Sequence, residues 1–141
     1  MELYHFTDCA NKDSILANGL KASTKYEVFT PVRENVGFCW LKKEDNKLVK
    51  DNQICFKVRV DSERCTIVDM DYVSMAMMYK HGARENVTAK KPPNPTAEKL
   101  FVQLYEVTAV KPCDYHEGMH FSPEVLVKGD IQLSDIELCA E

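Results

Sequence analysis

The feature of this chain that most constrains its fold is a series of short apolar stretches typical of β-strands. Residues 53–60 (QICFKVRV) alternate between apolar and polar side chains, as expected of a strand with one buried face. Residues 36–41 (VGFCWL) are almost entirely apolar, which is typical of a strand buried on both faces. The same reasoning predicts further strands at residues 2–7, 66–69, 99–110 and 124–127.

Two segments predict helices that end at a glycine. Thr7 or Asp8 can cap a helix through the segment DCANKDSILAN, and Gly19 can supply its left-handed end. Residues 71–81 have apolar side chains at helical spacing and are followed by Gly82. Strands therefore dominate the prediction, with short helices near the start and the middle.

Two other segments are assigned from local composition. The segment 90–98 (KKPPNPTAE) is rich in proline, so we expect a connector that is neither helix nor central strand. Residues 133–138 (LSDIEL) are predicted to form a last turn of helix.

Size and composition indicate an ordinary globular protein. The chain of 141 residues fits one domain, 1–141, and its hydrophobic residues make up 45% and its charged residues 28%. No signal peptide and no apolar stretch of about 20 residues is visible, so we expect a cytoplasmic monomer without membrane contact. Six cysteines without CxxC spacing are interpreted as reduced thiols. The net charge of −4 gives no electrostatic drive toward nucleic acid.

The stretch HEGMH, residues 116–120, matches the zinc-peptidase pattern H-E-x-x-H. That pattern holds a metal only on a helix, where one turn brings both imidazoles to the same face. Here Pro112 and Pro123 bracket the motif and Gly118 lies inside it, all of which favour a loop. We therefore predict no metal site and expect solvated histidines in this loop.

The two ends of the chain carry a more specific pattern. The segment LYHFTDCANKDSILANGLK (3–21) places a histidine in the first strand, before a helix that ends in Gly-Leu. The segment FSPEVLVKGDIQLSDI (121–136) places a glutamate at the start of a late strand, behind a polar loop. Together with VGFCWL they resemble the ADP-ribosyltransferase superfamily, in the type that uses a first-strand histidine and a late glutamate, as in small bacterial and DNA-modifying members.

The resemblance implies an α+β fold, a split β-sandwich of two antiparallel sheets with a few short helices and NAD in the cleft between them. It implies NAD-dependent transfer of ADP-ribose to a macromolecular acceptor, protein or nucleic acid, with release of nicotinamide. Glu124 would stabilise the positive charge that develops on the ribose, and His5 would hydrogen-bond a ribose hydroxyl. The resemblance assigns NAD binding to His5, Phe6 and Thr7.

Two parts of the expected site are assigned less directly. The resemblance places the acceptor loop before the catalytic strand, which selects His116, Glu117, His120 and Ser122. A tyrosine that stacks on nicotinamide is expected, and Tyr72 and Tyr79 are the candidates; Phe38 and Trp40 are alternatives that we expect to pack in the core. The small hydroxylated residue that the family has after its second strand is missing here, because Lys42 and Lys43 follow WL. Two alternatives therefore stay open: an NAD glycohydrolase, or a module of the same fold that binds a nucleotide or protein without catalysis.

Overall fold

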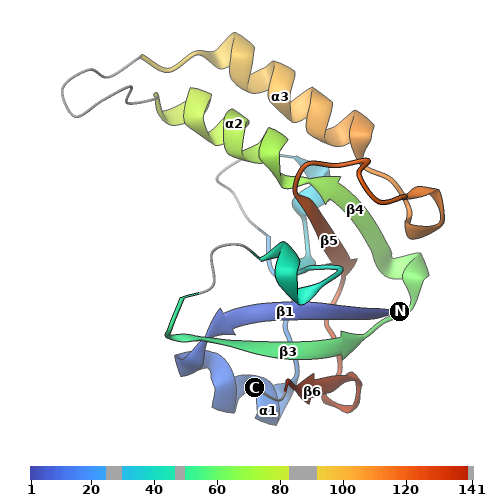
Figure 1. Ribbon diagram of the computed structural model, residues 1–141. Helices are drawn as coiled ribbons and strands as arrows, with labels where there is room; N and C mark the ends of the chain where they lie inside the picture. Colours follow the sequence, from blue (N-terminus) through green and yellow to red (C-terminus); the bar gives the residue numbers. More distant parts are fainter. Residues whose placement is uncertain (25–29, 47–49, 83–91, 140–141) are drawn as a thin grey trace.

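Two antiparallel β-sheets and a pair of helices dominate the computed structural model, which describes residues 1–24, 30–46, 50–82 and 92–139 (Figure 1). The first sheet has the strand order β1–β3–β6, with β1 at Glu2–Asp8, β3 at Gln53–Arg59 and β6 at Ile136–Leu138. The second has the order β2–β5–β4, with β2 at Val36–Cys39, β5 at Pro123–Lys128 and β4 at Cys65–Asp69. The helices are α1 at Lys12–Asn18, α2 at Met70–His81 and α3 at Pro95–Thr108. Single 3₁₀ turns lie at η1 Cys9–Asn11, η2 Pro31–Arg33, η3 Lys43–Asp45, η4 Ser62–Arg64, η5 Pro112–Asp114 and η6 Leu133–Asp135.

The two sheets meet at one isolated bridge. The backbones of Tyr4 in β1 and Trp40, just past β2, exchange hydrogen bonds of 2.9 and 2.7 Å. Beyond this bridge the sheets diverge, and in Figure 1 β1 and β3 run across the view while β4 and β5 run steeply. The architecture is α+β with two antiparallel three-stranded sheets, in agreement with the coarse prediction.

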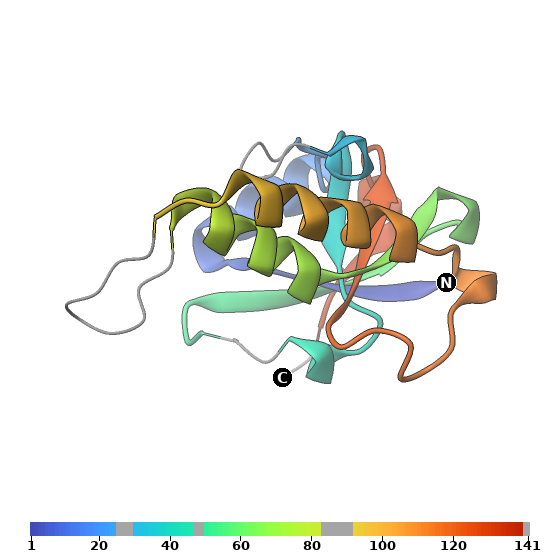
Figure 2. The ribbon, with the colours of Figure 1, turned by 90° about the horizontal axis from the view of Figure 1, so that it is seen from above.

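Two hydrophobic cores lie on opposite faces of the second sheet. The first core lies between the sheets, and the second lies between the second sheet and the pair α2–α3, which run side by side in Figures 1 and 2. Successive residues of β5 alternate between them, because side chains on a strand point to opposite faces. The first core comprises Leu3, Ile15, Leu20, Cys39, Phe56, Val58, Val60, Cys65, Ile67, Val125, Val127 and Ile131. The second comprises Val36, Val68, Val73, Ala76, Tyr105 and Leu126.

The predicted C-terminal ends of both helices are confirmed, whereas α1 begins at Lys12, later than the predicted cap at Thr7 or Asp8. Gly19 ends α1 with φ 78°, and a Cβ built there would lie 2.5 Å from the carbonyl oxygen of Ile131, so only glycine fits. Asp8 caps the 3₁₀ turn η1 that precedes α1. Gly82 follows α2 with φ 83°.

The strand predicted at residues 99–110 is wrong, because residues 99–108 belong to α3. Its β-branched and aromatic residues favoured a strand, but Phe101, Val102 and Tyr105 lie at helical spacing and pack in the second core from one side of the helix. Asn94 caps the start and Pro95 occupies the first helical position, where its missing N–H costs nothing.

Two predictions from local composition also need correction. The proline-rich connector is non-helical only at residues 92–94, since α3 already begins at Pro95; residues 90–91 lie outside the described residues. The predicted helical turn at 133–138 is a 3₁₀ turn followed by the edge strand β6, which pairs with β3. An edge strand of only three residues is too short to give a recognisable alternation of apolar and polar residues in the sequence.

Candidate functional site

Glu124 is a buried carboxylate on β5. Its side chain shares a face with Leu126, so it points into the second core, and only 5% of the residue is exposed. Oε1 accepts a hydrogen bond of 3.0 Å from Nη1 of Arg33, which makes a buried ion pair. Burial raises the pKa of Glu124, and the Arg33 guanidinium opposes that shift. A carboxylate held in this way has a fixed orientation and a strong local field.

Arg33 is the residue that organises this site, and sequence reasoning missed it. It ends the 3₁₀ turn η2, which Thr30 caps by accepting from the N–H of Val32. Nη1 also donates to the hydroxyl of Tyr105 at 3.1 Å, and the guanidinium lies 4.6 Å from the centroid of the Phe38 ring. Burial raises the pKa of Tyr105 to about 12, so its hydroxyl stays protonated. The only signal in the sequence was an arginine in the segment TPVR, residues 30–33, and this segment does not indicate which residue the arginine would contact.

His5 lies on the other side of β2, in the first sheet. It shares a face of β1 with Leu3, which belongs to the first core. Its Nδ1 is 2.7 Å from the carbonyl oxygen of Phe38, so Nδ1 carries the proton and donates to this acceptor. Burial lowers the pKa of His5, while the hydrogen bond to Phe38 opposes that shift. The imidazole is therefore held in its neutral form with a fixed tautomer.

His5 and Glu124 flank the end of β2 but point into different layers. Cys39 pairs with Val125 in β5, and the next residue, Trp40, pairs with Tyr4 in β1. The side chains take different partners, because His5 contacts the backbone of Phe38 and Glu124 contacts Arg33.

The structure places the other predicted NAD-binding residues at two separate locations. Phe6 lies opposite Cys55 in β3, and the Thr7 hydroxyl accepts a hydrogen bond of 2.9 Å from Asn11. Tyr72 and Tyr79 lie on α2 against Phe101 of α3, with ring centroids 6.4 and 5.6 Å away. The two tyrosines therefore pack within the helix pair, whereas Phe6 and Thr7 accompany His5 on β1.

The stretch HEGMH is not helical, as predicted: it forms a turn in which Gly118 has φ 87°. His116 and Glu117 are exposed, and Glu117 forms a surface ion pair of 2.9 Å with Lys42. His120 is only 7% exposed, which corrects the expectation of a solvated side chain. Its Nε2 lies 3.2 Å from the carbonyl oxygen of Ile67 and its ring packs on Tyr115, contacts that sequence spacing cannot reveal. Within the described ranges, no three His, Cys, Asp or Glu side chains are grouped as a metal would need.

Asp69 anchors the end of this loop, and the sequence analysis did not select it. The carboxylate is 1% exposed and accepts hydrogen bonds from the backbone N–H of Phe121 and Ser122, at 3.0 and 3.2 Å. It also caps α2 by accepting from the N–H of Asp71, whose own carboxylate accepts from the Ser122 hydroxyl at 2.7 Å. An aspartate directly before a predicted helix was the available signal. These bonds fix the approach of the loop to β5.

A pocket of about 260 Å³ lies beside the loop and close to the start of β5. The loop supplies Gly118 and the buried His120, and the segment after β2 supplies the facing wall. Pro123, adjacent to Glu124, belongs to the lining. The complete lining is Leu41, Lys42, Asp45, Tyr115, Glu117, Gly118, His120, Phe121 and Pro123.

Comparison of the chain with protein-family models, with curated proteins and with solved structures found no match. Of the helices described, none has the length and apolar character needed to cross a bilayer. The functional interpretation therefore depends on the local chemistry of Glu124, Arg33 and His5.

Proposed function

We propose that this protein transfers ADP-ribose from NAD to a macromolecular acceptor and releases nicotinamide. The observation that carries the proposal is the buried Glu124 carboxylate, held by Arg33 on the strand that the resemblance assigns to catalysis. The neutral His5 lies across β2, on the strand that the resemblance assigns to NAD binding.

The reaction needs a fixed negative charge near the ribose. Cleavage of the bond between nicotinamide and ribose develops positive charge on the sugar, as in glycoside hydrolysis. A preoriented carboxylate in a low-dielectric site stabilises that charge more strongly than water does. Glu124 is the proposed catalytic residue, and Arg33 is a positioning residue that holds its carboxylate.

The acceptor side of the proposal uses the loop before β5. The pocket beside this loop has Pro123 in its lining, so an acceptor group bound there would lie next to the catalytic strand. His116 and Glu117 are exposed on the same loop and can contact an incoming macromolecule. The hydrogen bonds that the loop backbone donates to the Asp69 carboxylate keep the loop in place for this role.

Labelled NAD tests the proposal directly. Incubated with labelled NAD and a cell lysate, the wild-type protein should label a macromolecule, and Glu124→Gln should reduce that labelling by at least about a hundredfold. Glu137→Gln is the matched control, because Glu137 is an exposed glutamate on β6 and should leave labelling unchanged. Equal labelling by wild type and Glu124→Gln would refute the proposal.

A second candidate is a module that binds a nucleotide without catalysis. It is favoured by the burial of Glu124, which is only 5% exposed and already paired with Arg33. Calorimetry that detects NAD binding, combined with no release of nicotinamide, would support this second candidate. Any measurable release that depends on Glu124 would exclude it.

A further inference from the structure

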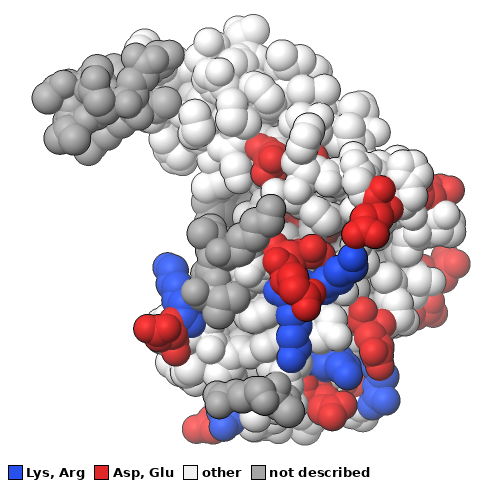
Figure 3. Space-filling model, in the orientation of Figure 1, with Lys and Arg blue, Asp and Glu red and all other residues white. Residues whose placement is uncertain are grey.

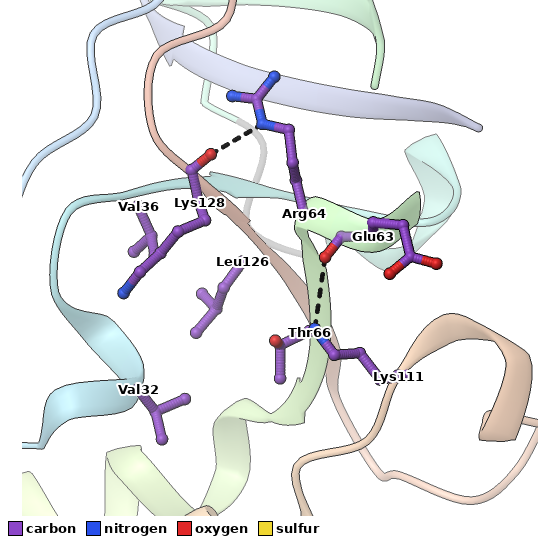
Figure 4. A pocket seen from close by; sticks show the side chains of 8 residues that line it. All are labelled: Val32, Val36, Glu63, Arg64, Thr66, Lys111, Leu126 and Lys128. Atoms are coloured by element: carbon purple, nitrogen blue, oxygen red, sulfur yellow. Dashed lines mark hydrogen bonds between the residues drawn. The ribbon is translucent and has the colours of Figure 1, made fainter. Parts of the chain in front are cut away.

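A basic pocket lies on the side of the second sheet that faces the helix pair, at the end of β5 that is distant from Glu124. Figure 4 shows its apolar floor, formed by Val32, Val36 and Leu126. Lys128 and Lys111 stand on two sides of that floor, with Thr66 beside them. The pocket has a volume of about 270 Å³ and is lined by Val32, Val36, Glu63, Arg64, Thr66, Lys111, Leu126 and Lys128.

The positive charges around this pocket are held in place by backbone carbonyl groups. Lys128 donates to the carbonyl of Glu34 at 2.8 Å, and Lys111 donates to the carbonyl of Glu63 at 3.4 Å. Arg64 donates through Nε to the carbonyl of Lys128 at 2.9 Å. Carbonyl acceptors fix the direction of a cation but carry no formal charge. The ion pairs found within the described ranges involve none of these three cations.

One carboxylate, that of Glu63, also borders the pocket. Figure 4 shows its carboxylate directed away from the apolar floor, as is the guanidinium of Arg64, so Lys111 and Lys128 are the charged groups on the two sides of the floor. On the face of the protein seen in Figure 3, cationic and anionic side chains are intermixed. With the net charge of −4, this pattern favours one discrete anion over a long polyanion.

We propose that this pocket binds a small organic phosphate that carries one phosphoryl group. The phosphoryl oxygens would accept from the ammonium groups of Lys128 and Lys111 and from the Thr66 hydroxyl, and the organic part would lie against Val32, the partly exposed residue of the floor. This site is separate from the proposed NAD site, and its occupancy does not depend on NAD turnover.

Phenyl phosphate is a suitable probe, because it combines a flat apolar group with one phosphoryl group. Titrated by NMR, it should shift the backbone signals of Val36, Thr66 and Leu126. Phenol and inorganic phosphate should each bind about tenfold more weakly or worse, because each lacks one half of the recognised chemistry.

Charge-removing variants locate the site. Lys128→Gln and Lys111→Gln should each lower the affinity for phenyl phosphate by about tenfold. Lys99→Gln, at an exposed position of α3, should leave this affinity unchanged. The NMR spectra report folding of each variant. Unchanged affinity in both pocket variants, or shifts confined to other surfaces, would overturn the proposal.

An independent observation concerns Cys55 in β3 and Cys139, just after β6. The two residues lie opposite each other, and the N–H of Cys139 donates to the carbonyl of Cys55 at 3.0 Å. Their sulfur atoms are 3.1 Å apart, and both residues are half-buried. Residues paired in this way in an antiparallel ladder have Cα atoms about 5.5 Å apart, a separation that a disulfide also prefers.

We infer that these two thiols form a disulfide when a low-molecular-weight disulfide is present. One thiolate attacks the small disulfide, one small thiol leaves, and the second cysteine displaces the other small thiol. Two protein thiols are oxidised and one small disulfide is reduced to two thiols. Burial, and then the contact with the Cys139 thiol, raise the pKa of Cys55 to about 12, so little of its thiolate exists at neutral pH and we expect the reaction to be slow.

The bond would join positions 84 residues apart and fasten the end of β6 to β3. Incubated with oxidised glutathione, the protein should lose two hydrogens in intact-mass analysis, and peptide mapping should find Cys55 joined to Cys139. Cys55→Ser should instead keep a glutathione adduct on Cys139. An unchanged mass in the wild type, or a map that joins other cysteines, would contradict the inference.

Discussion

The two cores of this protein differ in what they bury. The core between the sheets is built from aliphatic and aromatic side chains and cysteines, with His5 at its border as a neutral imidazole. The core between the second sheet and the helix pair contains an ion pair, Arg33 with Glu124, and the hydroxyl of Tyr105. Both cores use the same strand, β5, whose residues alternate between them.

This difference shows where such a small domain can bury charged side chains. A buried charge is costly unless it is paired and hydrogen-bonded. The second core meets that requirement with partners from three elements: η2 supplies Arg33, β5 supplies Glu124 and α3 supplies Tyr105. The first core stabilises the sheets by apolar burial, while the second holds a buried carboxylate in a defined orientation.

The largest effect should come from breaking the ion pair on one side. Arg33→Met leaves the Glu124 carboxylate buried without its partner, which should lower the free energy of unfolding by about 3–5 kcal/mol in urea denaturation. Adding Glu124→Gln to Arg33→Met should recover most of that loss, because the uncompensated charge is gone. The control Arg59→Met changes an exposed arginine and should be nearly neutral. A double variant no more stable than Arg33→Met would show that the charge is not the cause.

Two neighbouring residues of β5 allow the two cores to be compared directly. Leu126→Ala removes apolar volume from the second core and should cost about 2–5 kcal/mol, and Val127→Ala does the same in the first core at roughly 2 kcal/mol. The measurement is again urea denaturation of each variant. A negligible cost at Leu126 would mean that the helix pair does not pack on the second sheet as described.

A smaller effect is expected when Tyr105 loses only its hydroxyl. Tyr105→Phe removes the acceptor of one Arg33 hydrogen bond and keeps the apolar ring, so the free energy of unfolding should fall by about 1–2 kcal/mol. Val107→Thr, at a position of α3 that is 76% exposed, should change it by less than about 0.5 kcal/mol. Equal effects of the two substitutions would argue against a structured buried site.

The pH dependence of stability should have opposite signs for the two cores. The raised pKa of Glu124 means that the folded state binds the proton of this carboxyl more tightly than the unfolded state does. The resulting stabilisation of the folded state is complete below about pH 4.5 and is lost as pH rises through the folded pKa. The lowered pKa of His5 makes its contribution complete above about pH 6.5 and lost as pH falls through the folded pKa.

Comparison of wild type with Glu124→Gln and with His5→Gln from pH 4 to 8 tests both signs. Relative to Glu124→Gln, the wild type should lose stability as pH rises from 4.5. Relative to His5→Gln, it should lose stability as pH falls from 6.5. The same pH trend in both comparisons would contradict the described environments.

The sequence predicted the sheets better than the helix pair. Alternation identified β3, and Gly19 and Gly82 correctly ended α1 and α2, because these signals are local. The segment 99–110 was misassigned because its aromatic and β-branched composition favours a strand. Its packing against α2 stabilises the helix instead, and local composition does not report such a contact.

The candidate site was only partly visible in the sequence. Glu124 and His5 stood out because their flanks resemble a family pattern. Arg33 and Asp69 did not, since their importance comes from hydrogen bonds to residues 91 and 53 positions away. Contacts between residues so far apart in the sequence are set by the topology of the second sheet, and they cannot be predicted from residue spacing.

Nicotinamide release from NAD, measured for the purified protein with and without added lysate, tests the central claim most directly, because every transfer of ADP-ribose releases nicotinamide whatever the acceptor. Wild type should release nicotinamide, and Glu124→Gln should release at least about a hundredfold less while Glu137→Gln matches wild type. Folding of each protein is checked by its urea denaturation curve. Release that is unaffected by Glu124→Gln, or no release by a folded wild-type protein supplied with NAD and lysate, would contradict the claim that this buried carboxylate is catalytic.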